Sequence, residues 1–217
     1  LWLLWFCCFG VWGANATIVM NLSQIYRADE GSYSTSTDSM LVALSGIGSA
    51  LGRVVVGLID GAFTARRTSI TLLLPVPSIG TVLCVLTFLL LPVEAVIIPF
   101  FLSAFSFGFS WAVIVLVARV MFKHDVGKHY DFMYTGGTVA LVAFNWGLFG
   151  HLYDHVAGNE RDGGGHATAG DDGKASCIGK ECFQTTFIVL AVTNLICIVA
   201  AVVLHRRWVT TYFLSGQ

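Results

Sequence analysis

Six apolar runs dominate this sequence, and each is long enough to cross a lipid bilayer as an α-helix, which takes about 20 residues. Strands of a membrane β-barrel would instead alternate apolar and polar residues over about 10 positions. The runs here are continuous, as in 187–192, so the sequence predicts an all-α membrane protein with six transmembrane helices. Pro75, Pro77 and Pro99 predict kinks within their spans. The predicted spans are 2–25, 40–60, 70–91, 95–121, 132–154 and 183–204.

The charge content excludes most classes of soluble protein. Only 12% of the 217 residues are charged, against about 25% in soluble domains, and the mean hydropathy is +0.77. So few charges cannot coat a soluble enzyme, and 12 basic against 13 acidic residues provide no field for nucleic acid. The sequence contains no catalytic triad, phosphate-binding loop or zinc-finger spacing. We therefore expect no enzyme, no cofactor and no nucleic-acid partner, and we expect the chain to lie in a lipid bilayer.

The charges between the spans predict an orientation, because short basic loops resist translocation across a membrane. Eight basic residues lie at one set of span ends and four at the other, where acidic residues dilute them. The side with eight is expected to be cytoplasmic, so both ends of this multi-pass chain would face the cytoplasm, in the plasma membrane or an organelle membrane. These eight are Arg53, Arg66, Arg67, Arg119, Lys123, Lys128, Arg206 and Arg207.

The stretch 157–181 is a long loop, rich in glycine and small polar residues, and is expected to be a flexible tether on the outer side. Cys177 and Cys182 lie near its end, where an oxidising compartment would allow a disulfide. The other cysteines fall within apolar spans and are predicted to be small buried side chains: Cys7, Cys8, Cys84 and Cys197.

Two histidines, His151 and His155, lie four residues apart at the outer end of the fifth span. Imidazoles at that spacing on a helix can share a metal ion, and His166 follows in the next loop. No third ligand is fixed by the spacing, however, so we predict no metal site.

The second span carries an arginine, Arg53, and an aspartate, Asp60, seven residues apart on one helix face. An intramembrane guanidinium needs a carboxylate, a substrate anion or water. Arg53 is therefore either an anion-binding or gating charge on a transport pathway, or half of a structural ion pair near the inner surface. Small residues at Gly48 and Gly52, and at Gly57 and Gly61, provide patches where another helix can approach closely.

Amide side chains lie within the first and fifth spans, at Asn15 and Asn145. A buried amide in a helical bundle either hydrogen-bonds a neighbouring helix or faces a polar cavity. The stretch Thr135-Gly-Gly-Thr in the fifth span suits a moving wall beside a cavity or a close contact with another helix.

Several motifs, taken in order, carry a family resemblance. They are Gly13-Ala-Asn-Ala-Thr followed by Asn21-Leu-Ser-Gln-Ile, Gly52-Arg-Val-Val-Val-Gly, the stretch 122–132, Gly150-His-Leu-Tyr-Asp, and Cys177-Ile-Gly-Lys-Glu-Cys-Phe. With them the chain resembles the C-terminal six-helix half of a major facilitator superfamily transporter. The resemblance is to the nodulin-like group, which is related to oxalate/formate and monocarboxylate carriers.

The resemblance implies a twelve-helix fold in which two six-helix halves rock around a site near the bilayer midplane. This chain would be one half, and a further six-helix segment is expected upstream of Leu1. The implied function is secondary active transport of a small organic anion such as a monocarboxylate, coupled to protons. The two alternatives are a transporter that handles metal ions such as iron, and a receptor or scaffold that reuses the fold without transporting.

The resemblance also suggests site residues. Arg53 matches an anion-binding arginine, and a transporter should bring Arg53, Asn15 and Asn145 together on a water-accessible cavity. A scaffold would instead bury these side chains in pairs. The acidic and basic residues at the end of the second span would form a cytoplasmic latch: Asp60, Arg66 and Arg67.

Overall fold

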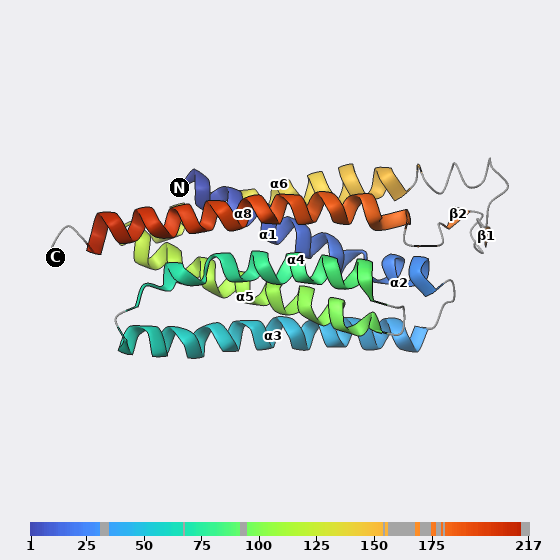
Figure 1. Cartoon of the computed structure of the whole chain (residues 1–217), viewed down its shortest axis with the longest axis horizontal. Helices are drawn as coiled ribbons and strands as arrows, with labels where there is room; N and C mark the ends of the chain where they lie inside the picture. Colours follow the sequence, from blue (N-terminus) through green and yellow to red (C-terminus); the bar gives the residue numbers. More distant parts are fainter. Residues whose placement is uncertain are drawn as a thin grey trace.

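The computed structural model is a bundle of long helices in which successive membrane-spanning segments run in opposite directions (Figure 1). Within the described residues, the two-residue strands β1 (Thr168–Ala169) and β2 (Ala175–Ser176) pair with each other. It describes residues 1–30, 35–66, 68–91, 95–153, 155, 168–169, 175–176, 179 and 181–213.

Six helical segments of the described chain are long and apolar enough to cross a membrane, which confirms the all-α class and the six predicted spans. They are formed by α1 (Trp2–Met20), α3 (Thr35–Ala65), the 3₁₀ turn η1 (Ile70–Leu73) with α4 (Pro75–Leu90), α5 (Ile97–Met121), α6 (Val126–Leu141) with the π-helix η3 (Val142–Gly150), and α8 (Glu181–Phe213).

The first span is shorter than predicted, because the chain leaves the helix at Asn21. The Asn21 N–H still donates to the carbonyl of Thr17 at 3.1 Å, but its φ of −101° and ψ of 17° end α1. A separate helix, α2 (Leu22–Glu30), follows with one buried face, so the polar residues after Met20 belong to an amphipathic segment rather than to the span.

The predicted third and fourth spans match the structure to within two residues, whereas the second, fifth and sixth are too short for a different reason. The structure extends the second span to Ser36–Ala65 and the sixth to Glu181–Thr211, and it begins the fifth at Val126. Most of the added turns, such as 36–39, 126–131 and 205–211, contain polar or charged residues, so a hydropathy pattern leaves them out although their backbone remains helical.

The prolines begin helices rather than kinking them. Pro75 is the first residue of α4 and Pro77 lies in the same turn, directly after η1, and Pro99 lies in the first turn of α5. The first N–H groups of a helix have no acceptor within it, so proline removes no hydrogen bond there. Pro99 therefore does not interrupt its span, whereas Pro75 and Pro77 lie where the third span changes from 3₁₀ to α geometry.

Helix α1 is central and α3 is peripheral. In α1, 61% of the most apolar stretch is buried inside the bundle, whereas in α3 the buried share of the corresponding stretch is only 22%. Helix α1 packs against α4, α5, α6 and α8, whereas α3 packs chiefly against α5. Both chain ends lie at one end of the bundle, and α2 lies at the other (Figure 1).

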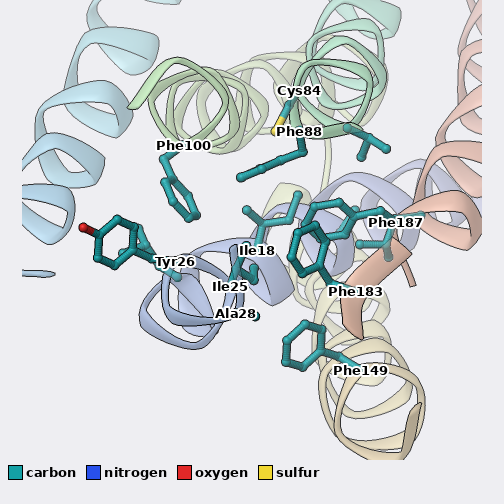
Figure 2. Close-up of a cluster of buried hydrophobic side chains, with 14 of the residues drawn as sticks. Ile18, Ile25, Tyr26, Ala28, Cys84, Phe88, Phe100, Phe149, Phe183 and Phe187 are labelled. Carbon is teal, nitrogen blue, oxygen red and sulfur yellow. The ribbon is translucent and has the colours of Figure 1, made fainter. Parts of the chain in front are cut away.

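Two apolar clusters fill the interior. The first lies towards α2 and contains Phe88, whose ring centroid is 5.0 Å from those of Phe100 and Phe187 (Figure 2). The second lies towards the chain ends and contains Trp12 and Phe109. Along α1 and α5, the buried polar residues Asn15 and Ser103 come between them.

The backbones of α3 and α5 meet closely at glycines. A Cβ at Gly48 would lie 3.1 Å from the carbonyl oxygen of Phe101, one at Gly52 would collide with the backbone of Phe105, and one at Gly108 with that of Ser49. This confirms the predicted close approach for Gly48 and Gly52. At Gly57 and Gly61, by contrast, a Cβ would meet nothing within 4 Å in the described part of the chain.

Candidate functional site: the groove beside Arg53

Arg53 is exposed on α3, within the apolar span and about three turns, or roughly 18 Å, from the helix end at Ala65. It forms no ion pair with Asp60 and no hydrogen bond or ion pair with any other residue that the structure describes. The structural pairing of Arg53 with Asp60 is therefore not formed, and the guanidinium is left available to a group outside the described chain.

An open groove of about 590 Å³ lies beside Arg53, between α3 and α5. Its volume falls in the range of small-molecule sites, about 300–1,000 Å³. Among the described residues, the arginine is the one charged member of the lining. The remaining lining residues are Val56, Gly57, Trp111, Ala112, Val115 and Leu116.

The groove adjoins a group of aromatic side chains. Trp111 of α5 stacks on Trp12 of α1, with ring centroids 4.2 Å apart and an interplanar angle of 15°, and Tyr134 of α6 lies 5.7 Å from Trp111. These three residues also line a second pocket of about 150 Å³. The phenol of Tyr130 on α6 lies close enough to Arg53 to interact with the positive charge of its guanidinium.

Sequence reasoning did not select these aromatic residues. Tryptophan in membrane proteins is most common at the two bilayer surfaces. Trp12 and Trp111 instead lie well inside their spans, and that position is the signal that could have identified them.

Asn15 is fully buried and does not reach the groove. Its Nδ2 donates to the hydroxyl of Thr81 at 2.7 Å and to the carbonyl of Val11 at 2.8 Å, and its Oδ1 accepts from the hydroxyl of Ser103 at 3.0 Å. We call Asn15, Thr81 and Ser103 the central polar layer. It joins α1, α4 and α5, so this amide connects helices.

Asn145 is also bonded within the bundle. It lies in η3 and accepts a hydrogen bond at Oδ1 from Nδ2 of Asn21, the residue at which α1 ends. The structure therefore does not bring Asn15, Asn145 and Arg53 together on one cavity. Of the two interpretations of the Thr135–Thr138 stretch, the structure shows the close contact with another helix. A Cβ at Gly137 would lie 2.5 Å from Cε3 of Trp12 on α1.

The two proposed latch residues that the structure describes lie near the end of α3 without pairing. Asp60 is half-buried, Arg66 is exposed in the turn after the helix, and no ion pair joins them. Arg67 lies outside the described residues.

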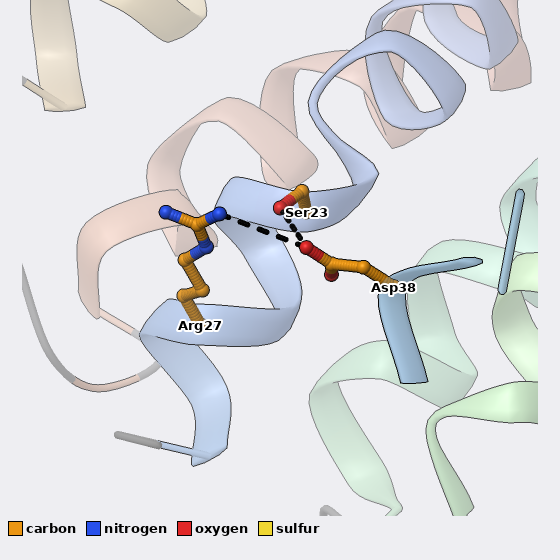
Figure 3. Close-up of polar contacts among 3 residues, drawn as sticks. All are labelled: Ser23, Arg27 and Asp38. Carbon is orange, nitrogen blue, oxygen red and sulfur yellow. Dashed lines mark hydrogen bonds and ion pairs between the residues drawn. The ribbon is translucent and has the colours of Figure 1, made fainter. Parts of the chain in front are cut away.

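An ionic contact at the opposite end of the bundle was not predicted. The Ser23 hydroxyl donates to Oδ2 of Asp38 at 2.8 Å, and the Arg27 guanidinium lies 3.6 Å from the same oxygen (Figure 3). Asp38 lies in the first turn of α3, where the helix dipole favours a negative charge. The contact ties α2 to α3.

The cysteines within the spans are buried and free, as predicted: Cys7, Cys8, Cys84 and Cys197. Cys182 is disulfide-bonded, whereas Cys177, its predicted partner, lies outside the described residues. His151 and His155 are exposed, and no three metal-ligating side chains gather within the described ranges.

The groove thus combines the exposed Arg53, within an apolar span, with an apolar and aromatic wall. Its lining comes from α3 and α5, and the aromatic residues that contact Trp111 come from α1 and α6. Comparison with protein-family models, with curated proteins and with solved structures finds nothing that matches this chain.

Proposed function

We propose that this chain forms one wall of a secondary transporter for a small organic anion. The observation that carries the proposal is Arg53, an exposed guanidinium within a membrane span that has no ion pair among the described residues and lines a groove of about 590 Å³. An arginine facing lipid at the centre of a span costs about 2.5–3.5 kcal/mol on insertion scales. An anion, together with a second six-helix unit covering this face, would remove that cost.

The mechanism proposed is alternating access. Two six-helix units would rock around a site between them, and Arg53 would hold the anion until the opposite side opens. The guanidinium is suited to this because its planar fork binds a carboxylate through two parallel hydrogen bonds. Coupling to protons belongs to the same proposal.

The internal hydrogen bonds of Asn15 and Asn145 favour the alternative of a non-transporting scaffold, since both amides connect helices. They leave Arg53 as the residue that distinguishes the two functions. A scaffold has no use for an unpaired charge facing an open groove, whereas an anion transporter requires one.

Uptake into proteoliposomes tests the proposal directly. The complete gene product is reconstituted, and uptake of formate, acetate, lactate and oxalate is measured with and without an inward proton gradient. We expect saturable uptake of at least one anion, lost in both Arg53→Gln and Arg53→Lys, because lysine keeps the charge but not the fork.

Arg119→Gln is the matched control, because Arg119 is an exposed arginine in the last turn of α5 and does not line the groove. It should transport like the unaltered protein. Normal uptake by both Arg53 variants, or no saturable uptake of any anion by the unaltered protein, would overturn the proposal.

A further inference from the structure

The chemistry of the groove beside Arg53 restricts the kind of anion that fits it. In the part of the chain that the structure describes, the lining supplies a single positive charge and no acidic residue. An anion with one carboxylate would be neutralised at Arg53. A second carboxylate would have to lie against Val56, Val115 or Leu116, where its loss of hydration would not be compensated.

A flat aromatic surface borders the groove. The indole of Trp111 lines the groove and stacks on the indole of Trp12, with ring centroids 4.2 Å apart. Trp12 is only 3% exposed and its ring lies flush against Gly137, so it is fixed in place. A side chain held in this way offers a rigid stacking partner at little cost in conformational entropy.

The lining of the groove lacks side-chain bulk at Gly57 of α3. This glycine lines the groove, and a Cβ there would meet no described atom within 4 Å. The groove of about 590 Å³ therefore has room for a ring-sized group, and a side chain added at Gly57 would begin in open space.

We propose that the groove selects a monocarboxylate with an aromatic body, its carboxylate on Arg53 and its ring against Trp111. This inference rests on the proposed function and specifies its substrate class. It predicts that charge and ring are both required, because the guanidinium and the apolar wall each contact a different part of the ligand.

Three probes separate the two requirements. Phenylacetate has the charge and the ring, acetate has the charge alone, and phenylacetamide has the ring without the charge. Binding is measured calorimetrically on the complete gene product in detergent, so that partition of the probes into lipid does not contribute. Phenylacetate should bind about tenfold or more tightly than acetate, since burial of a phenyl group supplies the difference. Phenylacetamide and oxalate should show no saturable binding.

Two glycine variants locate the ring. Gly57→Leu should weaken phenylacetate binding about tenfold by filling the groove. Gly46→Leu is the matched control, because Gly46 lies three turns away on the same face of α3, also faces open space and does not line the groove. It should change binding by no more than about twofold.

The outcomes distinguish the inference from the function on which it rests. Equal binding of acetate or oxalate and phenylacetate, equal binding of phenylacetamide, or an unchanged affinity in Gly57→Leu would each overturn the inference. Saturable uptake of small anions without preference for the aromatic one would keep the transporter and overturn its specificity. Selective binding of phenylacetate without uptake would support the site and overturn the transport function.

Discussion

The side-chain amides of Asn21 and Asn145 are hydrogen-bonded to each other where two helices depart from regular α geometry. Asn21 ends α1, and Asn145 lies in η3, the π-helical continuation of α6. Phe144 and Phe149, five residues apart, are both buried in this segment, which suits the wider turn of a π-helix. Local irregularities in α1 and α6 are thus joined by one polar contact.

A double-mutant cycle at Asn21 and Asn145 tests whether this contact stabilises the bundle. We expect a coupling free energy of about 0.6 kcal/mol and no more than about 1.7, as for other hydrogen bonds between membrane helices. Unfolding of Asn21→Ala, Asn145→Ala and the double variant in mixed micelles gives this value. Strictly additive effects would show that the two amides act independently.

Asn15 should affect stability rather than transport. Asn15→Ala leaves the buried hydroxyl of Ser103 without its acceptor and that of Thr81 without its donor, so the free energy of unfolding should fall by about 1–2 kcal/mol. Thr87→Ala is the control, because among the described residues Thr87 bonds only within its own helix, to the carbonyl of Cys84, and a smaller loss is expected. An Asn15→Ala protein of normal stability with altered substrate preference would place Asn15 on the transport pathway instead.

The contact between α3 and α5 should not tolerate a methyl group at its closest points. Gly52→Ala and Gly108→Ala each force a Cβ into the backbone of the facing helix and should destabilise the protein by about 1–3 kcal/mol. Gly46→Ala, which meets open space on the same helix, should be neutral or slightly stabilising because alanine favours helix. Thermal unfolding of the three purified variants measures the difference, and equal midpoints would contradict the close packing of α3 on α5.

Cysteine labelling tests the orientation predicted from the basic loops. Arg66 follows the last residue of α3, and Lys123 lies between α5 and α6. Helices α3 and α5 both end at the side of the bundle where the N and C labels lie (Figure 1). We expect Arg66→Cys and Lys123→Cys to resist an impermeant thiol reagent in intact cells and to react after permeabilisation. The four free native cysteines are buried and should add little background. A Gly163→Cys variant should react in intact cells, and the reverse pattern would invert the topology.

The number of spans and the glycine contact were predictable because both depend on local sequence. An apolar run fixes a spanning helix by its length, and the spacing of Gly48 and Gly52 produces a smooth patch whatever helix covers it. The predicted bounds of the spans were less accurate, since polar segments such as residues 126–131 are helical but do not raise the hydropathy.

The candidate site was predicted only in part, because its other members depend on partners distant in the sequence. Arg53 could be selected from its charge within a span. Whether Asn15 faces a cavity or a neighbouring helix depends on Thr81 and Ser103, which lie 66 and 88 residues away. The position of Trp111 beside Arg53 likewise depends on how α5 packs against α3.

The central polar layer has a consequence for how the chain is made. Asn15 is synthesised before both of its interhelical partners, which follow by 66 and 88 residues. At about 5–20 residues per second, the ribosome needs on the order of 3–18 s to deliver them, whereas a helix forms in about a microsecond. During that interval α1 is already helical and carries an amide that lipid cannot satisfy. Helix α1 is therefore expected to stay beside the insertion machinery until α4 and α5 arrive, although it enters the membrane before them.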